Sequence, residues 1–193
     1  MEGSGNSSTE QVIEFDYDKH LYTVKGEDYP SLHRILEEFG LIDKRWYKTE
    51  YADRGKAVHE LTALIDRELI TIDDIDEYKG YCEAWLQFKE DFKPEIIDIE
   101  KPVAHSIYKY ACTPDRICKI NGRNAIIDIK SGSPEKWHGI QMVAQDMAAG
   151  LENAILYEVY LKETGKYKPV QYQRSKYQNY WMAALILHQY KRK

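Results

Sequence analysis

The chain has 193 residues, of which 43% are hydrophobic, and its formal net charge is -5. These values are ordinary for one well-packed globular domain, and the acidic balance argues against a protein that coats nucleic acid through bulk electrostatics. No apolar run approaches the roughly 20 residues of a membrane span, and the N-terminus lacks a secretory or organelle-targeting pattern. We therefore expect a cytoplasmic protein with no membrane partner.

The N-terminal third predicts a lead-in followed by a hairpin and helices. Residues 1–10 are rich in glycine and serine, so we interpret them as a disordered lead-in or tag remnant, and 11–193 as a single domain. The stretches VIEFD and LYTVK predict a β-hairpin, after which Pro30-Ser31 resembles a helix start and Gly40 a stop. Apolar residues at helical spacing then predict helices at about 50–70 and 75–92.

The C-terminal half alternates between predicted strands and helices. In order, the patterns indicate a strand at 103–110, a hairpin at 113–132, a helix at 135–149, a second hairpin around Thr164-Gly165 and a closing helix at 174–190. The three cysteines, Cys82, Cys112 and Cys118, lack CxxC spacing, so neither a disulfide framework nor a zinc site is supported.

The hairpin TPDRICKINGRNAIIDIKSG carries the most informative charges. Asn121-Gly122 is a strong signal for a two-residue type I′ turn, because both residues tolerate positive φ. That turn sets a register in which Asp115 lies opposite Asp128, and side-chain alternation places Lys130 on the same face. Opposed carboxylates repel each other unless a cation compensates them. The pattern therefore predicts a site for a divalent cation.

Such a site suits phosphodiester hydrolysis. Mg²⁺ is typically held by one or two carboxylates together with waters and substrate phosphate, and an ammonium group could orient the attacking water. The alternative is a surface hairpin whose charges form a solvated salt-bridge cluster. Ile126, Ile127 and Ile129 argue against this alternative, because they place apolar side chains on both faces of the strand.

Four motifs occur in a familiar order: RGKAVH at 54–59, TPDR at 113–116, IDIKSG at 127–132 and HGIQ at 138–141. Together they resemble the PD-(D/E)XK nuclease superfamily, most closely its RecB-like and phage-type exonuclease branch. The segments YTVKG and YPSLHRIL near the N-terminus also resemble phage-encoded members.

The resemblance implies an α/β (α+β) fold with a restriction-endonuclease-like core, in which a central mixed sheet is flanked by helices and preceded by an N-terminal hairpin and helix. It also implies Mg²⁺ or Mn²⁺ as cofactor, with Asp115, Asp128 and the Ile129 carbonyl as ligands and Lys130 as the catalytic lysine. His59 matches a metal-binding histidine, although its place on the predicted helix lies away from the centre of the apolar stripe. No iron–sulfur cluster is expected, since only three cysteines are present.

Gln141 matches the first position of a QxxxY motif and is a candidate for catalysis or for contact with the DNA backbone; an exposed helical glutamine is the alternative. Gln145 stands where tyrosine is usual, which puts substrate positioning in doubt. Basic clusters, among them Lys44-Arg45, could bind phosphates, and aromatic residues such as Trp46-Tyr47 could stack on bases. The candidate substrate contacts are Arg54, Lys56, Arg116, Trp137, Gln141 and Gln145.

The leading hypothesis is a metal-dependent DNA exonuclease, of phage type, that serves recombination, replication or repair. Single-stranded or duplex DNA ends are the expected partner, and a homo-oligomer or a recombination partner protein is left open. The alternatives are an endonuclease or RNA-directed nuclease of the same fold, a non-catalytic DNA-binding module, and an interaction protein whose acids are surface charges.

Overall fold

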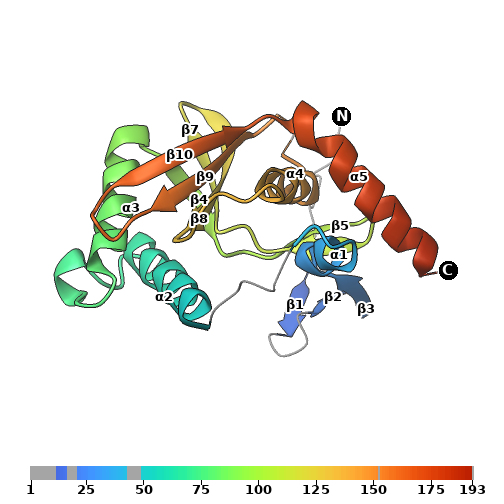
Figure 1. The fold of residues 1–193 in the computed structure, drawn as a ribbon, viewed down its shortest axis with the longest axis horizontal. Helices are drawn as coiled ribbons and strands as arrows, with labels where there is room; N and C mark the ends of the chain where they lie inside the picture. The colour runs from blue at the N-terminus through green and yellow to red at the C-terminus, as the bar shows by residue number, and fades with distance from the viewer. Residues whose placement is uncertain (1–11, 17–20, 43–48, 152, 193) are drawn as a thin grey trace, which may run out of the picture.

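The computed structural model describes residues 12–16, 21–42, 49–151 and 153–192. A five-stranded sheet forms its centre, with helices α2 and α3 on one side, α4 on the other and α5 packed on α4 (Figure 1). The predicted fold class, a central mixed sheet flanked by helices and preceded by a hairpin and helix, is confirmed. The lead-in at 1–10, the Lys44-Arg45 cluster and Trp46-Tyr47 lie outside the described residues. The assignment of 11–193 to one domain stays a prediction.

The N-terminal hairpin is part of a three-stranded antiparallel sheet of order β1-β2-β3. Its strands are β1 (Ile13–Asp16), β2 (Leu21–Val24) and β3 (Glu27–Pro30). The third strand was not predicted. Ser31 caps the following helix α1 (Leu32–Glu38), because its side-chain oxygen accepts a hydrogen bond of 3.1 Å from the backbone N–H of Arg34.

The central sheet has the order β10-β9-β8-β7-β4. Its strands are β4 (Glu95–Ile99), β7 (Arg116–Ile120), β8 (Arg123–Lys130), β9 (Ile155–Leu161) and β10 (Tyr167–Tyr172). Asn121 and Gly122 both have positive φ, 51° and 73°, and Ile120 pairs with Arg123. The predicted turn and register of this hairpin are therefore confirmed. Strands β8 and β9 pair in parallel, which makes the sheet mixed.

Two strand predictions were incomplete. The expected strand at 103–110 is interrupted by a turn, so that β5 (Val103–His105) and β6 (Tyr110–Cys112) form a separate two-stranded sheet. Strand β4 was missed, because its sequence EIIDI does not alternate strictly between polar and apolar residues; its pairing with β7 is interrupted by a register shift between Ile96 and Asp98. Local alternation is a weak signal for such a short edge strand.

Four longer helices complete the fold. They are α2 (Thr49–Asp66), α3 (Lys79–Phe92), α4 (His138–Ala149) and α5 (Arg174–Lys191), and a short 3₁₀ segment (Ile72–Asp74) lies between α2 and α3. Helix α2 therefore ends before Leu69, which is 65% exposed instead of buried as its spacing suggested. Helix α4 ends at Gly150, which adopts the left-handed conformation with φ of 64°.

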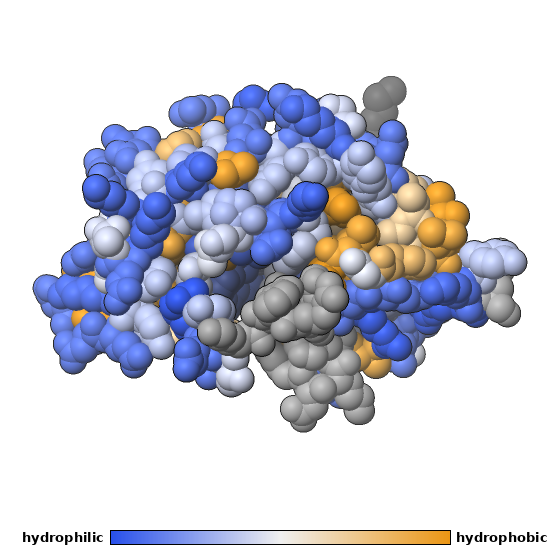
Figure 2. Space-filling model, in the orientation of Figure 1, coloured by the Kyte–Doolittle hydropathy of each residue, from blue (hydrophilic) through white to orange (hydrophobic). Residues whose placement is uncertain are grey.

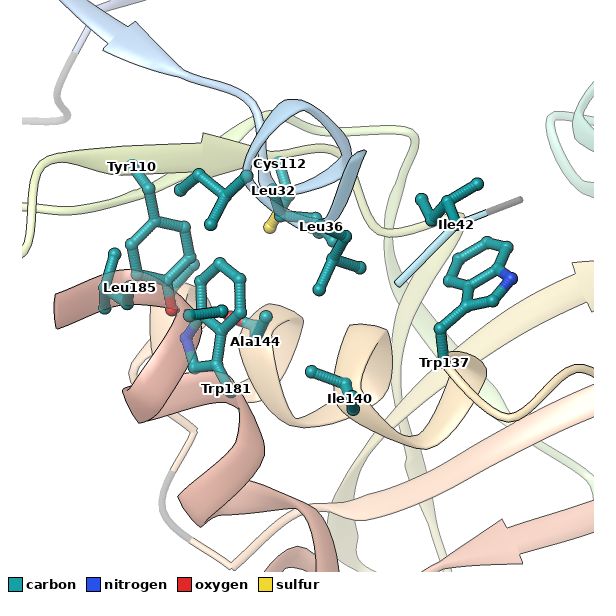
Figure 3. Close-up of a cluster of buried hydrophobic side chains, with 13 residues drawn as sticks. Leu32, Leu36, Ile42, Tyr110, Cys112, Trp137, Ile140, Ala144, Trp181 and Leu185 are labelled. Atoms are coloured by element: carbon teal, nitrogen blue, oxygen red, sulfur yellow. Dashed lines mark hydrogen bonds between the residues drawn. The ribbon is translucent and has the colours of Figure 1, made fainter. Parts of the chain in front are cut away.

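One apolar core joins α1, α4 and α5 to the small β5–β6 sheet. Figure 3 shows Tyr110 and Trp181 meeting between α4 and α5, with ring centroids 4.8 Å apart. The hydroxyl of Tyr110 donates to the backbone carbonyl of Ala144 at 2.8 Å, so the aromatic ring is buried with its polar atom satisfied. At Gly139 a Cβ atom would lie 2.5 Å from the Tyr177 ring, which shows how closely α4 approaches α5.

The surface differs between the two ends of the molecule. Figure 2 shows mainly hydrophilic residues over the sheet and α3 on the left, and apolar residues gathered over α5 on the right. Ile186 and Leu187 of α5 are 56% and 51% exposed. Within the described ranges, none of the helices is both long and apolar enough to cross a membrane. The expectations for oligomeric state and partner proteins stay predictions.

An ion pair between α1 and α5 predicts a pH-dependent stability. His188 Nδ1 lies 2.6 Å from Glu38 Oε2, and this contact, with help from Lys191, lowers the pKa of Glu38 below its ordinary value of 4.5. A lowered carboxylate pKa stabilises the fold above the unfolded pKa, and this contribution is lost as the pH falls through the folded pKa. Glu38→Gln should lower Tm at pH 7 by about 1 to 3 °C, with the difference shrinking below pH 4.5. Thermal melts from pH 3 to 8 test this; a difference that does not change with pH would instead indicate lost packing.

Candidate active site

The carboxylates of Asp115 and Asp128 lie at adjoining ends of two neighbouring strands. Arg116 pairs with Ile127, so continuing the β7–β8 register by one residue places Asp115 opposite Asp128. Asp115 Oδ2 accepts a hydrogen bond of 2.6 Å from the backbone N–H of Ile129, which fixes its position. Both side chains are buried, with 8% and 2% of the residue exposed. The structure thus brings the two acids together on one face of the sheet, as the register set by the Asn121-Gly122 turn predicted.

Lys130 faces the same site from the end of β8. Its Nζ lies 2.5 Å from Asp128 Oδ2 and donates to Gln141 Oε1 at 3.2 Å. The ammonium also lies 5.6 Å from the centre of the Trp137 ring. Asp128, Gln141 and Trp137 therefore hold the lysine, and 18% of its side chain remains exposed beside the adjoining cavity.

The two glutamines of α4 are turned towards β8. Gln141 Nε2 donates to Asp128 Oδ1 at 2.7 Å, and Gln145 Nε2 donates to the same oxygen at 3.1 Å. Both residues are buried, with 2% and 1% exposed, so Gln141 is not the exposed helical glutamine that was its alternative. The amide of Gln145 is enclosed beside the Asp128 carboxylate, so the prediction that Gln145 contacts the substrate directly is wrong. These side chains orient Asp128, and Gln141 links it to Lys130.

His59 approaches the site from α2. Its Nδ1 lies 3.2 Å from Asp115 Oδ1, and 29% of its side chain is exposed. The residue therefore sits where α2 meets the end of the sheet, although the apolar pattern of the helix placed it away from the buried side. Glu60, the next residue of α2, is exposed.

Burial and neighbouring charges shift the pKa values of these groups in opposite directions. Burial raises the pKa of Asp128, and the nearby Asp115 and Glu158 carboxylates add to that effect despite Lys130. Burial alone would also raise the pKa of Asp115, but His59 and Lys130 bring it below its ordinary value. Partial burial would lower the pKa of His59, whereas the Asp115 carboxylate raises it. The site contains buried negative charge that a further cation would stabilise.

The donor atoms fit a hard divalent cation such as Mg²⁺ or Mn²⁺. Among the described residues, no group of three or more His, Cys, Asp or Glu side chains forms a complete metal cage. Mg²⁺ does not require one, because it is usually held by one or two carboxylates with waters and phosphate oxygens. Asp115 and Asp128 supply such oxygens, and the pKa of Asp128 is raised first by burial and then by the neighbouring Asp115 and Glu158 carboxylates.

A cavity of about 870 Å³ opens beside Lys130, between α2, the β8–α4 loop and the β9–β10 turn. Arg54 reaches into its wall, where its guanidinium donates to the backbone carbonyl of Ser131 at 3.1 Å and lies 5.1 Å from the Tyr51 ring centre. The lining residues with polar or aromatic side chains include Tyr51, Arg54, His59, Tyr81, Lys130, Ser131, Trp137 and His138. Two acids, Glu135 and Glu163, also belong to the lining. Cationic groups beside aromatic rings are the combination with which proteins bind single-stranded nucleic acid.

The remaining predicted substrate contacts differ in their exposure. Lys56 is exposed on α2, and the residues that line the cavity do not include it. Trp137 lines the cavity but is only 8% exposed, because its ring packs in the core that Figure 3 shows and against Lys130. A base could therefore reach at most one edge of this ring.

Arg116 is not placed to bind substrate, contrary to the prediction. It is fully buried, its Nε donates to Asp66 at 2.6 Å, and its guanidinium also donates to the backbone carbonyl of Asp115 at 2.7 Å. Arg116 points towards the α2 and α3 side, because side chains alternate along β7 and its neighbour Asp115 faces the other way. Its observed role is to tie the backbone at Asp115 to α2.

Sequence reasoning missed Glu158 of β9. This residue pairs with Asp128 across the parallel strands and is fully buried. Its Oε2 lies 2.9 Å from Nδ1 of His138 and accepts hydrogen bonds from the hydroxyls of Tyr160 and Tyr172. The available signal was a single acid within the apolar run ILYEVYL, a pattern that indicates a buried charge with a partner.

Comparisons with known proteins find similarity among solved structures. No family model and no curated protein sequence matches this chain. Among solved structures, the chain is similar to an alkaline exonuclease from Laribacter hongkongensis, at 13% sequence identity and a TM-score of 0.42. The similarity covers 84% of this chain and 92% of the exonuclease chain. At this identity and TM-score, the function has to be inferred from the residues of the site.

Proposed function

We propose that this protein is a divalent-metal-dependent nuclease of the PD-(D/E)XK superfamily that hydrolyses DNA phosphodiester bonds. The observation that carries this proposal is the meeting of Asp115, Asp128 and Lys130 beside a cavity with cationic and aromatic walls. Two hard carboxylates next to a fixed ammonium supply the groups that phosphodiester hydrolysis requires.

Each residue has a role that follows from its contacts. Asp115, Asp128 and the Ile129 carbonyl would hold Mg²⁺ or Mn²⁺, and His59 would bind the metal or hold Asp115 in place. When bound, the metal would lower the pKa of a water and neutralise charge on the phosphate. Lys130 would orient the attacking water and stabilise negative charge in the transition state, and Gln141 would hold Lys130 and Asp128 in register.

The preferred activity is that of an exonuclease of phage type, acting on DNA ends in recombination, replication or repair. The cavity favours an unpaired strand, since Arg54 lies beside tyrosine rings on its wall.

The test is cleavage of linear and closed circular DNA, both single-stranded and duplex, with Mg²⁺, Mn²⁺ or EDTA. Metal-dependent loss of linear DNA alone supports an exonuclease, and cleavage of circles identifies an endonuclease. An RNA substrate of the same sequence separates the RNA-directed alternative. DNA binding without cleavage under any condition would contradict the proposal and favour a non-catalytic binding module.

Metal binding has its own expected result. A ligand that binds only the folded state stabilises it by RT ln(1 + [L]/Kd), so Mg²⁺ at about 100 times its Kd should add roughly 2.7 kcal/mol. We expect Tm to rise with Mg²⁺ and Mn²⁺ for the wild type, and the rise to be lost in Asp128→Asn. Equal metal effects on both proteins would mean that the ion binds elsewhere.

A further inference from the structure

A buried histidine–carboxylate pair adjoins the candidate active site. The contacts of the His138 ring with the protein that define its orientation are at Nδ1, which lies 3.3 Å from the backbone nitrogen of Glu135, 2.8 Å from the Tyr160 hydroxyl and 2.9 Å from Glu158 Oε2. The ring also lines the cavity that contains Lys130. Because Nδ1 faces the protein interior, Nε2 is the nitrogen available to a molecule in the cavity.

The parallel pairing of β8 and β9 places this pair one strand away from the acids. Asp128 pairs with Glu158, and Lys130 pairs with Tyr160, so all four side chains share the sheet face that α4 covers. Helix α4 begins at His138 and brings Gln141 over Asp128 one turn later. A phosphodiester held near Lys130 and Asp128 would therefore lie next to the imidazole of His138.

Two tyrosines hold the Glu158 carboxylate beside His138. Two tyrosine hydroxyls donate to Oε2, whereas Oε1 is buried and accepts no hydrogen bond from the described residues. A carboxylate held in this way orients the imidazole ring, which is the relation of acid to histidine in known catalytic pairs.

A purely structural network would not need a histidine at the cavity wall. His138 and Glu158 are 5% and 0% exposed at their side chains, and burying two ionisable groups has a cost that an apolar pair would avoid. The same face of the sheet is apolar nearer the start of β8 and β9, where Ile126 and Leu156 pack beneath α4. The buried polar groups of β8 and β9 on this face, Asp128, Glu158 and Tyr160, lie at the end that borders the cavity.

We infer that His138 is the general acid of the proposed reaction, donating the Nε2 proton to the leaving oxygen of the scissile phosphodiester. Water attacks phosphorus and loses its own proton to solvent. The bond from phosphorus to the leaving oxygen breaks, that oxygen takes the proton of His138, and solvent reprotonates the ring. Glu158 is a positioning residue for His138. This inference rests on the proposed function.

The test compares the normal substrate with one whose leaving group needs no general acid. The wild-type products first identify which bridging oxygen leaves, and that oxygen is then replaced by sulfur in an otherwise identical oligonucleotide, because a thiolate leaves without a proton. General acids contribute about 10²- to 10⁴-fold, so His138→Asn should cleave the oxygen substrate about 100-fold more slowly but the sulfur substrate within about 3-fold of wild type. Glu158→Gln should cleave the oxygen substrate about 10-fold more slowly than the wild type, and its rate on the sulfur substrate should again be close to that of the wild type.

His105→Asn, on the β5–β6 sheet, is the matched control and should cleave both substrates like the wild type. If His138→Asn loses the same factor in cleavage rate on the oxygen and the sulfur substrate, the inference is overturned, and the substitution impairs substrate binding or folding instead. Full activity of His138→Asn on the oxygen substrate would overturn it as well. If His138→Asn does not fold, the Glu158→Gln rates decide by the same comparison. A wild type that cleaves neither substrate contradicts the proposed function itself, and the inference with it.

Discussion

Lys130→Met is expected to lower the rate of DNA cleavage by about 100- to 1,000-fold, the usual cost of removing one preorganised group that stabilises transition-state charge. The ammonium is fixed by Asp128 and Gln141 and faces the cavity, so its contribution needs no rearrangement during the reaction. Methionine keeps the unbranched side chain against Trp137 and removes only the charge. Single-turnover cleavage at saturating Mg²⁺ measures the effect on the chemical step.

The matched control is Lys119→Met, the same change on an exposed position of neighbouring strand β7. It should cleave at the wild-type rate. Mg²⁺ should still raise Tm in Lys130→Met, because Asp115 and Asp128 are intact, which separates loss of chemistry from loss of metal. Cleavage by Lys130→Met at more than a tenth of the wild-type rate would contradict a catalytic role for this lysine.

Arg116→Met is expected to destabilise the protein by about 3–5 kcal/mol, because it removes one partner of a buried ion pair and leaves a carboxylate without its main counter-charge. Asp66 has no exposed side-chain surface and accepts from Arg116 at 2.6 Å, with Lys89 at 2.7 Å as a second cation. The guanidinium also holds the carbonyl of Asp115, so cleavage should fall together with stability. Urea unfolding followed by circular dichroism measures the change.

The control for this change is Arg123→Met, an exposed arginine in the same hairpin, which should alter stability by less than about 0.5 kcal/mol. Asp66→Leu combined with Arg116→Met should recover part of the loss, because no buried carboxylate then lacks its arginine. A cost below about 1 kcal/mol for Arg116→Met would show that Lys89 alone is a sufficient partner for Asp66.

The sequence alone was sufficient where short-range chemistry decides the structure. Asn121-Gly122 specified a two-residue turn, and the turn set the register that brings Asp115 opposite Asp128. Ser31 and Gly40 marked the two ends of helix α1 for equally local reasons, a side-chain cap and a left-handed backbone. These predictions held because each depends on residues only a few positions apart.

Other parts of the site were decided by contacts between distant segments. The alternation of side chains along β7 could show that Arg116 faces away from Asp115. Only the packing of α2 and α3 on the sheet shows that Asp66 is the ion-pair partner of Arg116. Gln141 and Gln145 could have been exposed, and it is the packing of α4 on the sheet that turns both amides onto Asp128.

Glu158 is the strongest example of such a contact. It is 30 residues from Asp128 in the sequence, and the parallel pairing of β8 with β9 makes them neighbours. Parallel strands need a long crossover connection, here through α4, and no local pattern sets their register. The sequence by itself therefore determined the hairpin with its two acids and lysine, while the tertiary structure decided which side chains surround them, because those neighbours come from strands and helices far apart in the chain.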